Sequence, residues 1–243
     1  MRKSILTAFV IIFSFYAATA QKENQPRLTN TSIVKDTSGT VVPYDIWTRL
    51  MLTGRYNVKS QKKEDAEFII YRLSDEEYER KIGEMPKPKE SRFFKTGNSF
   101  SHFKTTDING NKINTKNLAG KIIVLNFWFI NCPPCIMELP ELNRLADTYK
   151  SDSSVVFIAI ALDKKNELEQ FLRKAEFRYM LIDNGRFLTD QYGINSYPTN
   201  VIVDHEGKIY FHSSGLGIGM AHWLQKSIDE LKGKQTNKIA SSQ

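Results

Sequence analysis

The chain contains only two cysteines, Cys132 and Cys135, with two prolines between them. Such a pair is either a redox-active dithiol or half of a metal site. An apolar run from Ile122 to Ile130, interrupted by Asn126, leads into the pair. Apolar residues at spacings of three and four follow it, which is the pattern of one helix face. The sequence therefore predicts a buried strand, a turn that carries the cysteines, and a helix.

A cysteine in the first turn of a helix is acidified, because the helix dipole and the unpaired backbone N–H groups favour its anion. We expect Cys132 to attack a disulfide as the thiolate and Cys135, about one turn further, to resolve the mixed disulfide. Pro133 and Pro134 suit a helix start, whereas Pro140 lies inside the helix and should kink it. A purely structural bridge is disfavoured, since it would enclose only two residues and constrain little of the unfolded chain.

Three separated segments resemble the thioredoxin superfamily, and in particular the extracytoplasmic TlpA- and ResA-like thiol-disulfide oxidoreductases with their AhpC/TSA-type opening segment. They are Phe127 to Pro140, which reads F-W-x-x-x-C-x-P-C-x-x-E-x-P, then 107–121 with its D-I-N-G-N-K-I and L-A-G-K runs, and Tyr197-Pro198-Thr199. The resemblance covers about residues 97–232. It implies an α/β, thioredoxin-like fold, with a central mixed sheet flanked by helices and an extra helix and strand inserted before Pro198.

The resemblance also implies a site around the cysteines. The bond before Pro198 would be cis, and the backbone of Tyr197 would lie near the sulfurs, able to pair with an extended substrate segment. The residues expected to contact substrate are Trp128, Pro133, Pro134, Tyr197, Pro198 and Thr199. No cofactor is expected beyond the Cys132–Cys135 disulfide itself.

Two further residues bear on proton transfer. Asn126 occupies the strand position at which thioredoxins carry a buried acid, and an amide cannot titrate. Glu138 stands three residues after Cys135 and matches a glutamate of the active-site cavity in ResA-like proteins. We therefore take Glu138 as the candidate acceptor of the Cys135 proton. The alternative is a solvated glutamate in the first turns of a helix, where the dipole favours it.

Charge distribution and the N-terminal sequence indicate which partners and which cellular compartment to expect for this protein. The net charge is +7, but the basic residues are interleaved with acids and form no block, so a nucleic-acid partner is not expected. Arg2 and Lys3, an apolar segment from Ile5 to Ala18 and the run Ala18-Thr19-Ala20 predict a signal peptide over residues 1–20. We expect an exported, periplasmic protein that is soluble after cleavage, and a monomer. An uncleaved membrane anchor is the alternative.

The remaining chain divides into an accessory region and linker over 21–95, a thioredoxin-like domain over 96–233 and a polar tail over 234–243. The accessory region is predicted to be a small α+β extension that packs on the domain, since it is too short and charged to be stable alone. Ser74 and Glu77 predict a capping box within it. The expected helices are 44–52, 166–175 and 220–231, and the expected strands are 67–73, 155–162, 179–182, 199–203 and 208–212.

These patterns predict an exported protein-disulfide reductase that acts on the disulfides of other exported proteins, cytochrome c apoprotein among the candidates. With no third cysteine to relay electrons, it needs an external reductant. The resemblance suggests a membrane thiol-electron donor of the CcdA or DsbD type. The direction of transfer stays open, with a thiol oxidase or isomerase as the alternative.

Two rival chemistries fit less well. No metal is expected, because none of the four histidines, His102, His205, His212 and His222, pairs at zinc-ligand spacing. A non-catalytic, copper-binding thioredoxin-like protein remains an alternative, although such copper-delivery proteins have three residues between their cysteines. Peroxidase activity is disfavoured, since the P-x-x-x-T-x-x-C pattern of peroxiredoxins is missing around Cys132.

Overall fold

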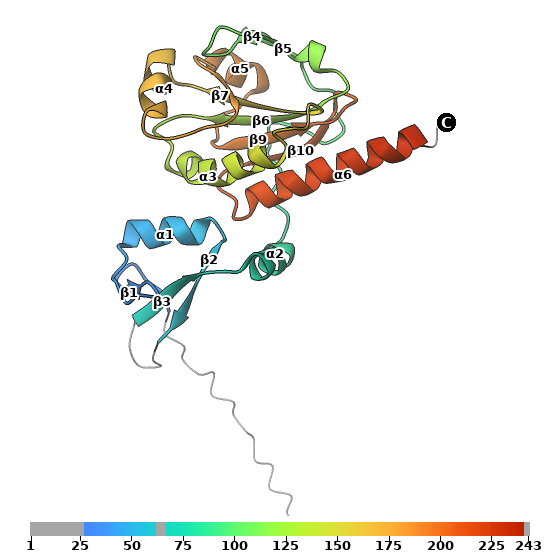
Figure 1. Ribbon diagram of the computed structural model, residues 1–243. Helices are drawn as coiled ribbons and strands as arrows, with labels where there is room; N and C mark the ends of the chain where they lie inside the picture. Colours follow the sequence, from blue (N-terminus) through green and yellow to red (C-terminus); the bar gives the residue numbers. More distant parts are fainter. Residues whose placement is uncertain (1–26, 62–66, 241–243) are drawn as a thin grey trace, which may run out of the picture.

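The computed structural model describes residues 27–61 and 67–240. They form two units, an accessory unit of residues 27–85 and a larger main unit of residues 96–240 (Figure 1). The predicted signal peptide and the last three residues of the predicted tail lie outside the described residues. No helix among the residues described is both long and apolar enough to cross a bilayer.

The main unit is built on a five-stranded mixed sheet in the order β10-β9-β6-β7-β8. Its strands are β6 (Ile122–Trp128), β7 (Val155–Ala161), β8 (Met180–Ile182), β9 (Thr199–Val203) and β10 (Ile209–Ser214). Strands β6, β7 and β8 are parallel to one another, and β9 runs antiparallel to both β6 and β10. All seven residues of β6 are buried, as expected for a central strand covered on both faces.

Helices cover both faces of this sheet. They are α3 (Pro133–Thr148), α4 (Lys165–Leu172), α5 (Arg186–Tyr192) and α6 (Met220–Ala240). Alternate side chains of β6 point to opposite faces, so the strand contributes to two cores. Val124 and Trp128 pack in one cluster with residues of α3, α4 and α6, and Leu125 and Phe127 pack in the other with residues of α5. This mixed α/β architecture is the thioredoxin-like fold predicted from the sequence.

The segment before β6 and the turn after β9 also match the sequence prediction. Strands β4 (Lys104–Thr106) and β5 (Lys112–Asn114) form an antiparallel hairpin, followed by a short 3₁₀ helix over Thr115–Leu118. In the β9–β10 turn, the Asp204 carboxylate accepts hydrogen bonds from the Glu206 and Lys208 amides. The strands expected at 199–203 and 208–212 are therefore present as β9 and β10, which pair as an antiparallel hairpin.

Helix α5 was not predicted from the sequence. It has only seven residues, which is too few to show a helical apolar pattern, and glycines mark its ends. Gly193 adopts a left-handed conformation, with φ of 67°, at the C-terminal end. Gly185 precedes the helix, and its amide donates to the Ala161 carbonyl at 2.7 Å. The helix thus starts against the end of β7.

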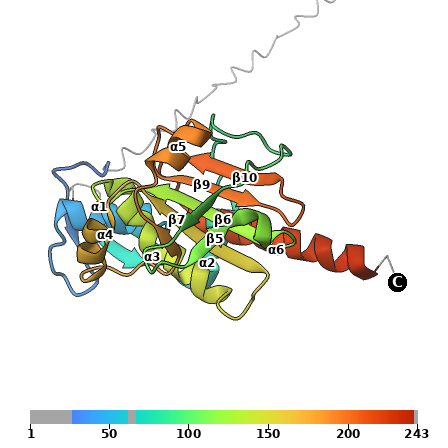
Figure 2. The same cartoon turned by 90° about the horizontal axis from the view of Figure 1, so that it is seen from above.

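Helix α6 is longer than predicted. The apolar pattern ends near Leu231, and the helix continues to Ala240, through most of the predicted polar tail. Figure 2 shows this second half of α6 projecting beyond the sheet. Because no apolar face is needed where a helix leaves the core, periodicity alone could not detect the extension.

The accessory unit holds a three-stranded sheet in the order β1-β3-β2 with two helices. Its elements are β1 (Ile33–Lys35), α1 (Tyr44–Leu52), β2 (Tyr56–Ser60), β3 (Glu67–Arg72) and α2 (Asp75–Gly83). The predicted capping box is present at the start of α2, where Ser74 and Glu77 exchange side-chain to backbone hydrogen bonds. Strand β2 was not predicted, because its Tyr-Asn-Val-Lys-Ser sequence carries a single aliphatic side chain.

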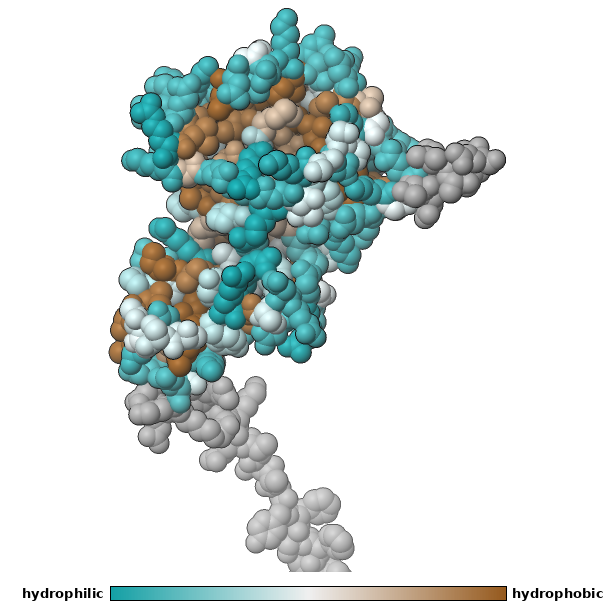
Figure 3. Space-filling view, in the orientation of Figure 1, coloured by the Kyte–Doolittle hydropathy of each residue, from teal (hydrophilic) through white to brown (hydrophobic). Residues whose placement is uncertain are grey.

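The accessory unit has two small apolar cores. One surrounds Trp47 and Ile70, and the other contains Tyr78 and Ile82 of α2. Hydrophobic surface remains visible over this unit (Figure 3). Its exposed large apolar residues are Ile33, Val41, Tyr44 and Ile46. A unit with so little core gains stability from contact with a neighbour, and α2 and the start of β2 supply that contact with the main unit.

The close packing of the start of α5 against β7 can be tested by substitution at Gly185. A Cβ at Gly185 would lie 2.3 Å from the Ile160 side chain and 2.8 Å from the Ala161 carbonyl oxygen. We predict that Gly185→Ala lowers the free energy of unfolding by about 1–3 kcal/mol, because β7 cannot move aside without breaking the sheet. Gly233→Ala is the control, since that position lies within α6 with open space around it. It should raise stability by up to about 1 kcal/mol. Equal midpoints of the two variants in urea would contradict the packing described.

Candidate functional site: a disulfide at the start of a helix

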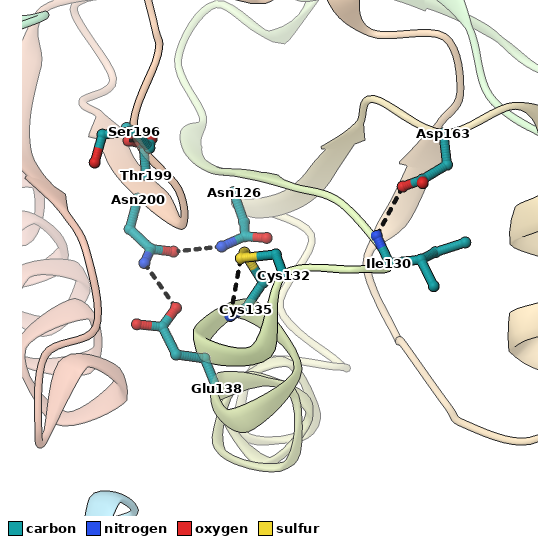
Figure 4. The surroundings of a disulfide bond; sticks show 9 residues. All are labelled: Asn126, Ile130, Cys132, Cys135, Glu138, Asp163, Ser196, Thr199 and Asn200. Atoms are coloured by element: carbon teal, nitrogen blue, oxygen red, sulfur yellow. Dashed lines mark hydrogen bonds between the residues drawn. A yellow bond between two sulfur atoms is a disulfide. The ribbon is translucent and has the colours of Figure 1, made fainter.

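The two cysteines lie where β6 ends and α3 begins, and they form a disulfide (Figure 4). Cys132 is the residue that caps the N-terminus of α3, and Pro133 and Pro134 occupy its first two positions. Prolines have no N–H group, so Cys135 supplies the first amide of the helix that can donate. That amide donates to Cys132 Sγ at an N···S distance of 3.3 Å. The local sequence therefore directs the first free donor of the helix at one sulfur.

Both cysteines are nearly inaccessible in this disulfide form. The exposed fractions are 3% for Cys132 and 1% for Cys135. The exposed ring of Pro133 and the half-buried ring of Pro134 lie at the surface beside them. Cys132 lies at the N-terminal end of α3 and Cys135 within its first turn, so the assignment of Cys132 as the attacking sulfur stays a prediction.

The loop before β9 has the predicted backbone geometry. The Tyr197–Pro198 bond is cis. The half-buried ring of Tyr197 packs edge-on against Phe129, with 5.4 Å between ring centroids. Pro198 is buried, and its carbonyl accepts a hydrogen bond from the Gly215 amide at 2.8 Å. This loop is thus fixed to both the cysteine turn and the segment after β10.

Besides Pro198, two further residues expected to contact substrate are buried. Trp128 has no exposed surface, because it lies on the core face of β6 and packs against Phe171 and Phe177. Thr199 is also fully buried, and its hydroxyl donates to the Ser196 carbonyl at 2.7 Å. Both side chains support the site from within and neither reaches a substrate here. Neither side chain is at the surface in this disulfide form, so its contact with a substrate stays a prediction.

A chain of buried polar side chains runs beside the disulfide. Asn126 Nδ2 donates to Asn200 Oδ1 at 2.9 Å, and Asn200 Nδ2 donates to Glu138 Oε2 at 3.1 Å (Figure 4). Asn126 and Asn200 are directly opposite each other in the β6–β9 pair. Neither asparagine can titrate, so the proton of this network belongs to the carboxyl of Glu138.

Glu138 is only 5% exposed, so the alternative of a solvated glutamate is wrong. Burial disfavours the charged form and raises the pKa of Glu138 to about 8, against the opposing effect of hydrogen bonds from Asn200 and the Gly217 amide. At neutral pH most of this carboxyl is therefore protonated. It can give up or take up a proton in the pH range in which thiols do so.

Sequence reasoning missed two residues that shape the site. Asn200 follows the cis-proline segment, and only the antiparallel register of β9 against β6 brings it to Asn126 and Glu138. Asp163 lies two residues after the end of β7, and its Oδ2 accepts a hydrogen bond from the Ile130 amide at 2.8 Å. It thereby fixes the turn that precedes Cys132. A polar residue at the carboxyl end of a predicted parallel strand was the available signal for Asp163.

The four histidines do not converge. His212 is buried in β10, where its Nδ1 faces the Ser91 amide at 3.1 Å, and His222 in α6 pairs with Glu79 at 3.1 Å. His102 contacts the Thr115 hydroxyl. Within residues 27–61 and 67–240, no group of three or more His, Cys, Asp or Glu side chains is arranged to hold a metal ion.

Known proteins with the same sequence features are thiol-disulfide oxidoreductases. The AhpC/TSA family model matches residues 96–212. The ResA thiol-disulfide oxidoreductase of Bacillus thuringiensis subsp. konkukian is 31% identical over 142 residues, which is 58% of this chain and 71% of that protein. The ResA protein of Halalkalibacterium halodurans is 29% identical over 124 residues, covering 50% and 70% of the two chains.

Solved structures agree on the fold. A putative thiol:disulfide interchange protein DsbE from Chlorobium tepidum superposes with a TM-score of 0.52 at 21% identity, over 57% of this chain and 98% of that one. A putative protein disulfide isomerase from Bacteroides thetaiotaomicron gives a TM-score of 0.51 at 19% identity, over 60% and 94%. Together with the cysteine turn, the cis-proline and the identity to ResA proteins, this places the chain in the TlpA/ResA-like family of thiol-disulfide oxidoreductases within the thioredoxin superfamily.

Proposed function

We propose that this protein is an exported protein-disulfide reductase that cycles Cys132 and Cys135 between dithiol and disulfide. The observation that carries the proposal is the Cys135 amide, which points at Cys132 Sγ from the start of α3. When the disulfide is reduced, that amide and the dipole of a 16-residue helix would stabilise a thiolate on Cys132.

In the reductive direction, the Cys132 thiolate attacks one sulfur of a client disulfide. The client S–S bond breaks, one client sulfur leaves as a thiolate that takes a proton from water, and a mixed disulfide forms. The Cys135 thiol then gives its proton to the Glu138 carboxylate and attacks Cys132 Sγ. The second client thiolate leaves, so the client gains two electrons and the protein ends in the disulfide form.

Regeneration reverses these roles. A donor thiolate attacks Cys132, the Cys132–Cys135 bond breaks, and Cys135 leaves with the electron pair. A protonated Glu138, the dominant form at neutral pH, supplies the proton that this sulfur needs. The second thiolate of the donor then attacks the donor sulfur of the mixed disulfide, so that Cys132 leaves as a thiolate and the donor is oxidised to its own disulfide. A carboxyl whose pKa lies near that of a thiol can serve in both directions, whereas an ordinary carboxylate would be too weak a base.

The proposal includes the compartment and the partners. A positively charged start, an apolar segment and the Ala18-Thr19-Ala20 run support export through a cleaved signal. The cis-proline segment offers a backbone edge to an extended client, so exported proteins with disulfides are the proposed substrates. A membrane thiol-electron donor of the CcdA or DsbD type would keep the pair reduced. The chain is proposed to act as a monomer, and cytochrome c apoprotein is one candidate client.

Trapping tests the proposed reaction. Reduced Cys135→Ala should form a stable mixed disulfide with insulin through Cys132, because the resolving thiol is gone. Intact-mass measurement detects the adduct, and peptide mapping locates it. Cys132→Ala is the matched control and should form no adduct, since Cys135 lies within α3 and is not the residue that caps its N-terminus. Equal adduct formation by both variants, or no insulin reduction by the wild type above the background of its reductant, would contradict the proposal.

The role of Glu138 is tested by pH. We predict that the rate at which Cys135 resolves a preformed mixed disulfide rises with pH through about 8 in the wild type, because only the carboxylate accepts a proton. Glu138→Gln should lose this pH dependence. At pH values above about 8 it should resolve the mixed disulfide about a hundredfold more slowly than the wild type. Glu169→Gln, an exposed residue of α4, is the control and should keep the wild-type profile. A Glu138→Gln profile that superposes on the wild type would exclude this role.

A further inference from the structure

The accessory unit packs directly over the helix that carries Glu138. Arg55, the residue before β2, binds the carboxylate of Glu141 through Nε at 3.3 Å, and its guanidinium group lies 4.1 Å from the ring centre of Tyr78. Glu141 is three residues after Glu138 on α3. A second pair joins Glu79 of α2 to His222 of α6 at 3.1 Å. The accessory unit therefore contacts the main unit at both α3 and α6.

Ile82 of α2 fills the centre of this contact and is fully buried. It lies between two glycines with positive φ, Gly54 at 74° and Gly219 at 75°. A Cβ at Gly54 would lie 3.1 Å from Ile82, and one at Gly219 would lie 3.0 Å from it. No larger residue fits at either position without displacing Ile82. This side chain thus holds the segment before α6 in place.

That segment is part of the surroundings of Glu138. Gly217, two residues before Gly219, lines the same small cavity as Glu138, and its amide opposes the rise in the pKa of that carboxyl. A small cavity of about 20 Å³ also lies at the junction. It is lined on one side by Leu52, Thr53 and Tyr78 of the accessory unit and on the other by Glu138 and Gly217. Such a volume accommodates a single water molecule.

One oxygen of Glu138 lacks a partner within the protein. Oε2 accepts from Asn200, whereas Oε1 is buried and has no hydrogen bond to any residue that the structure describes. An unsatisfied buried carboxyl oxygen is costly, and the adjoining cavity is large enough for the missing donor. A water bound there would be enclosed by residues of the accessory unit.

We propose that the accessory unit is a lid of the active site, which keeps Glu138 out of bulk water and, through Ile82, fixes the loop that lies beside it. An effect of the lid on catalysis depends on the proposed acid-base role of Glu138. The shielding of Glu138 from water by the accessory unit does not depend on that role. Thr53 and Tyr78 would enclose one water against Glu138. Residues of a unit that lies outside the matched family segment would thereby belong to the redox machinery.

The lid affects the ionisation of Glu138 through the burial of its carboxyl and not through a neighbouring charge. The titratable groups around Glu138 are Glu141 on α3, Arg55 and Tyr78 of the accessory unit, and Tyr179 before β8. The negative charge of Glu141 is matched by Arg55 and Arg144. Substituting Arg55 would change both the charge near Glu138 and its shielding from solvent. An uncharged residue of the interface therefore separates the two effects.

The experiment measures the titration of Glu138 itself. Protein labelled with ¹³C at the glutamate side-chain carboxyl, kept in the disulfide form, is followed by NMR against pH, and Glu138→Gln assigns the signal. We expect a wild-type midpoint near 8, as the buried carboxyl requires. Ile82→Ala should lower this midpoint by on the order of one pH unit or more, toward the ordinary glutamate value of about 4.3.

Ile70→Ala is the matched control. Ile70 is an equally buried isoleucine of the accessory unit, but it packs in the core around Trp47, away from α3. Its substitution should leave the Glu138 midpoint unchanged while amide exchange shows β2 and β3 still protected. If either substitution unfolds the accessory unit, the lid is lost. The midpoint of the Glu138 titration should then fall in that variant as well.

Two outcomes would overturn the lid. One is a Glu138 midpoint that stays near 8 in Ile82→Ala, whether or not the accessory unit remains folded. The other is a lowered midpoint in Ile70→Ala while the unit stays folded. Because the titration needs no client and no turnover, a failure to reduce insulin would refute the proposed function and leave this result standing.

Discussion

The structure depends on the way β6 runs into α3. Every residue of β6 is buried, so the strand has one register and one direction, and the chain leaves it at a fixed point beneath the start of the helix. Two prolines then remove the first two amides of α3, which makes the Cys135 amide the first donor available to Cys132. We expect this junction to make Cys132 the reactive sulfur, because both the dipole and the donor act on the residue that caps the helix.

A second constraint is the buried carboxyl beside that junction. Asn126 and Asn200 are polar groups on a sheet that is otherwise apolar at this level, and together they orient Glu138 without competing for its proton. A carboxyl that is held by amides and kept from water is a better match for a thiol than a surface glutamate. The accessory unit adds to this by packing its second helix against the loop that contacts Glu138. Domain organisation and proton chemistry are thereby connected through one side chain, Ile82.

Much of this arrangement was predictable from the sequence, because the strongest signals coincide with the site. Long apolar runs defined β6 and β7, and the cysteine turn, the Tyr197-Pro198 segment and the capping box at Ser74 are local motifs that tertiary context did not override. The missed elements were those with weak local patterns. Helix α5 is only seven residues long, β2 has a single aliphatic residue, and the end of α6 has no apolar face.

The site was harder to predict where it depends on burial and on pairing. Whether Trp128 faces a substrate or the core depends on which face of β6 it occupies, and the sequence around it is apolar on both faces. The contact between Asn200 and Glu138 joins residues 62 positions apart, and only the β9 register brings them together. The burial of Glu138 likewise requires atoms from a unit whose placement no local pattern encodes.

The most direct measurement of the central claim is the ionisation of the reduced cysteines. The rate of alkylation of the reduced protein by iodoacetamide, followed against pH by mass spectrometry of the Cys132 peptide, reports the thiolate. The account predicts that Cys132 reacts with a pKa well below the value of about 8.5 for a free thiol, while buried Cys135 reacts slowly. Two thiols that both titrate near 8.5 would contradict it, because the start of α3 would then confer no reactivity on the sulfur that it contacts.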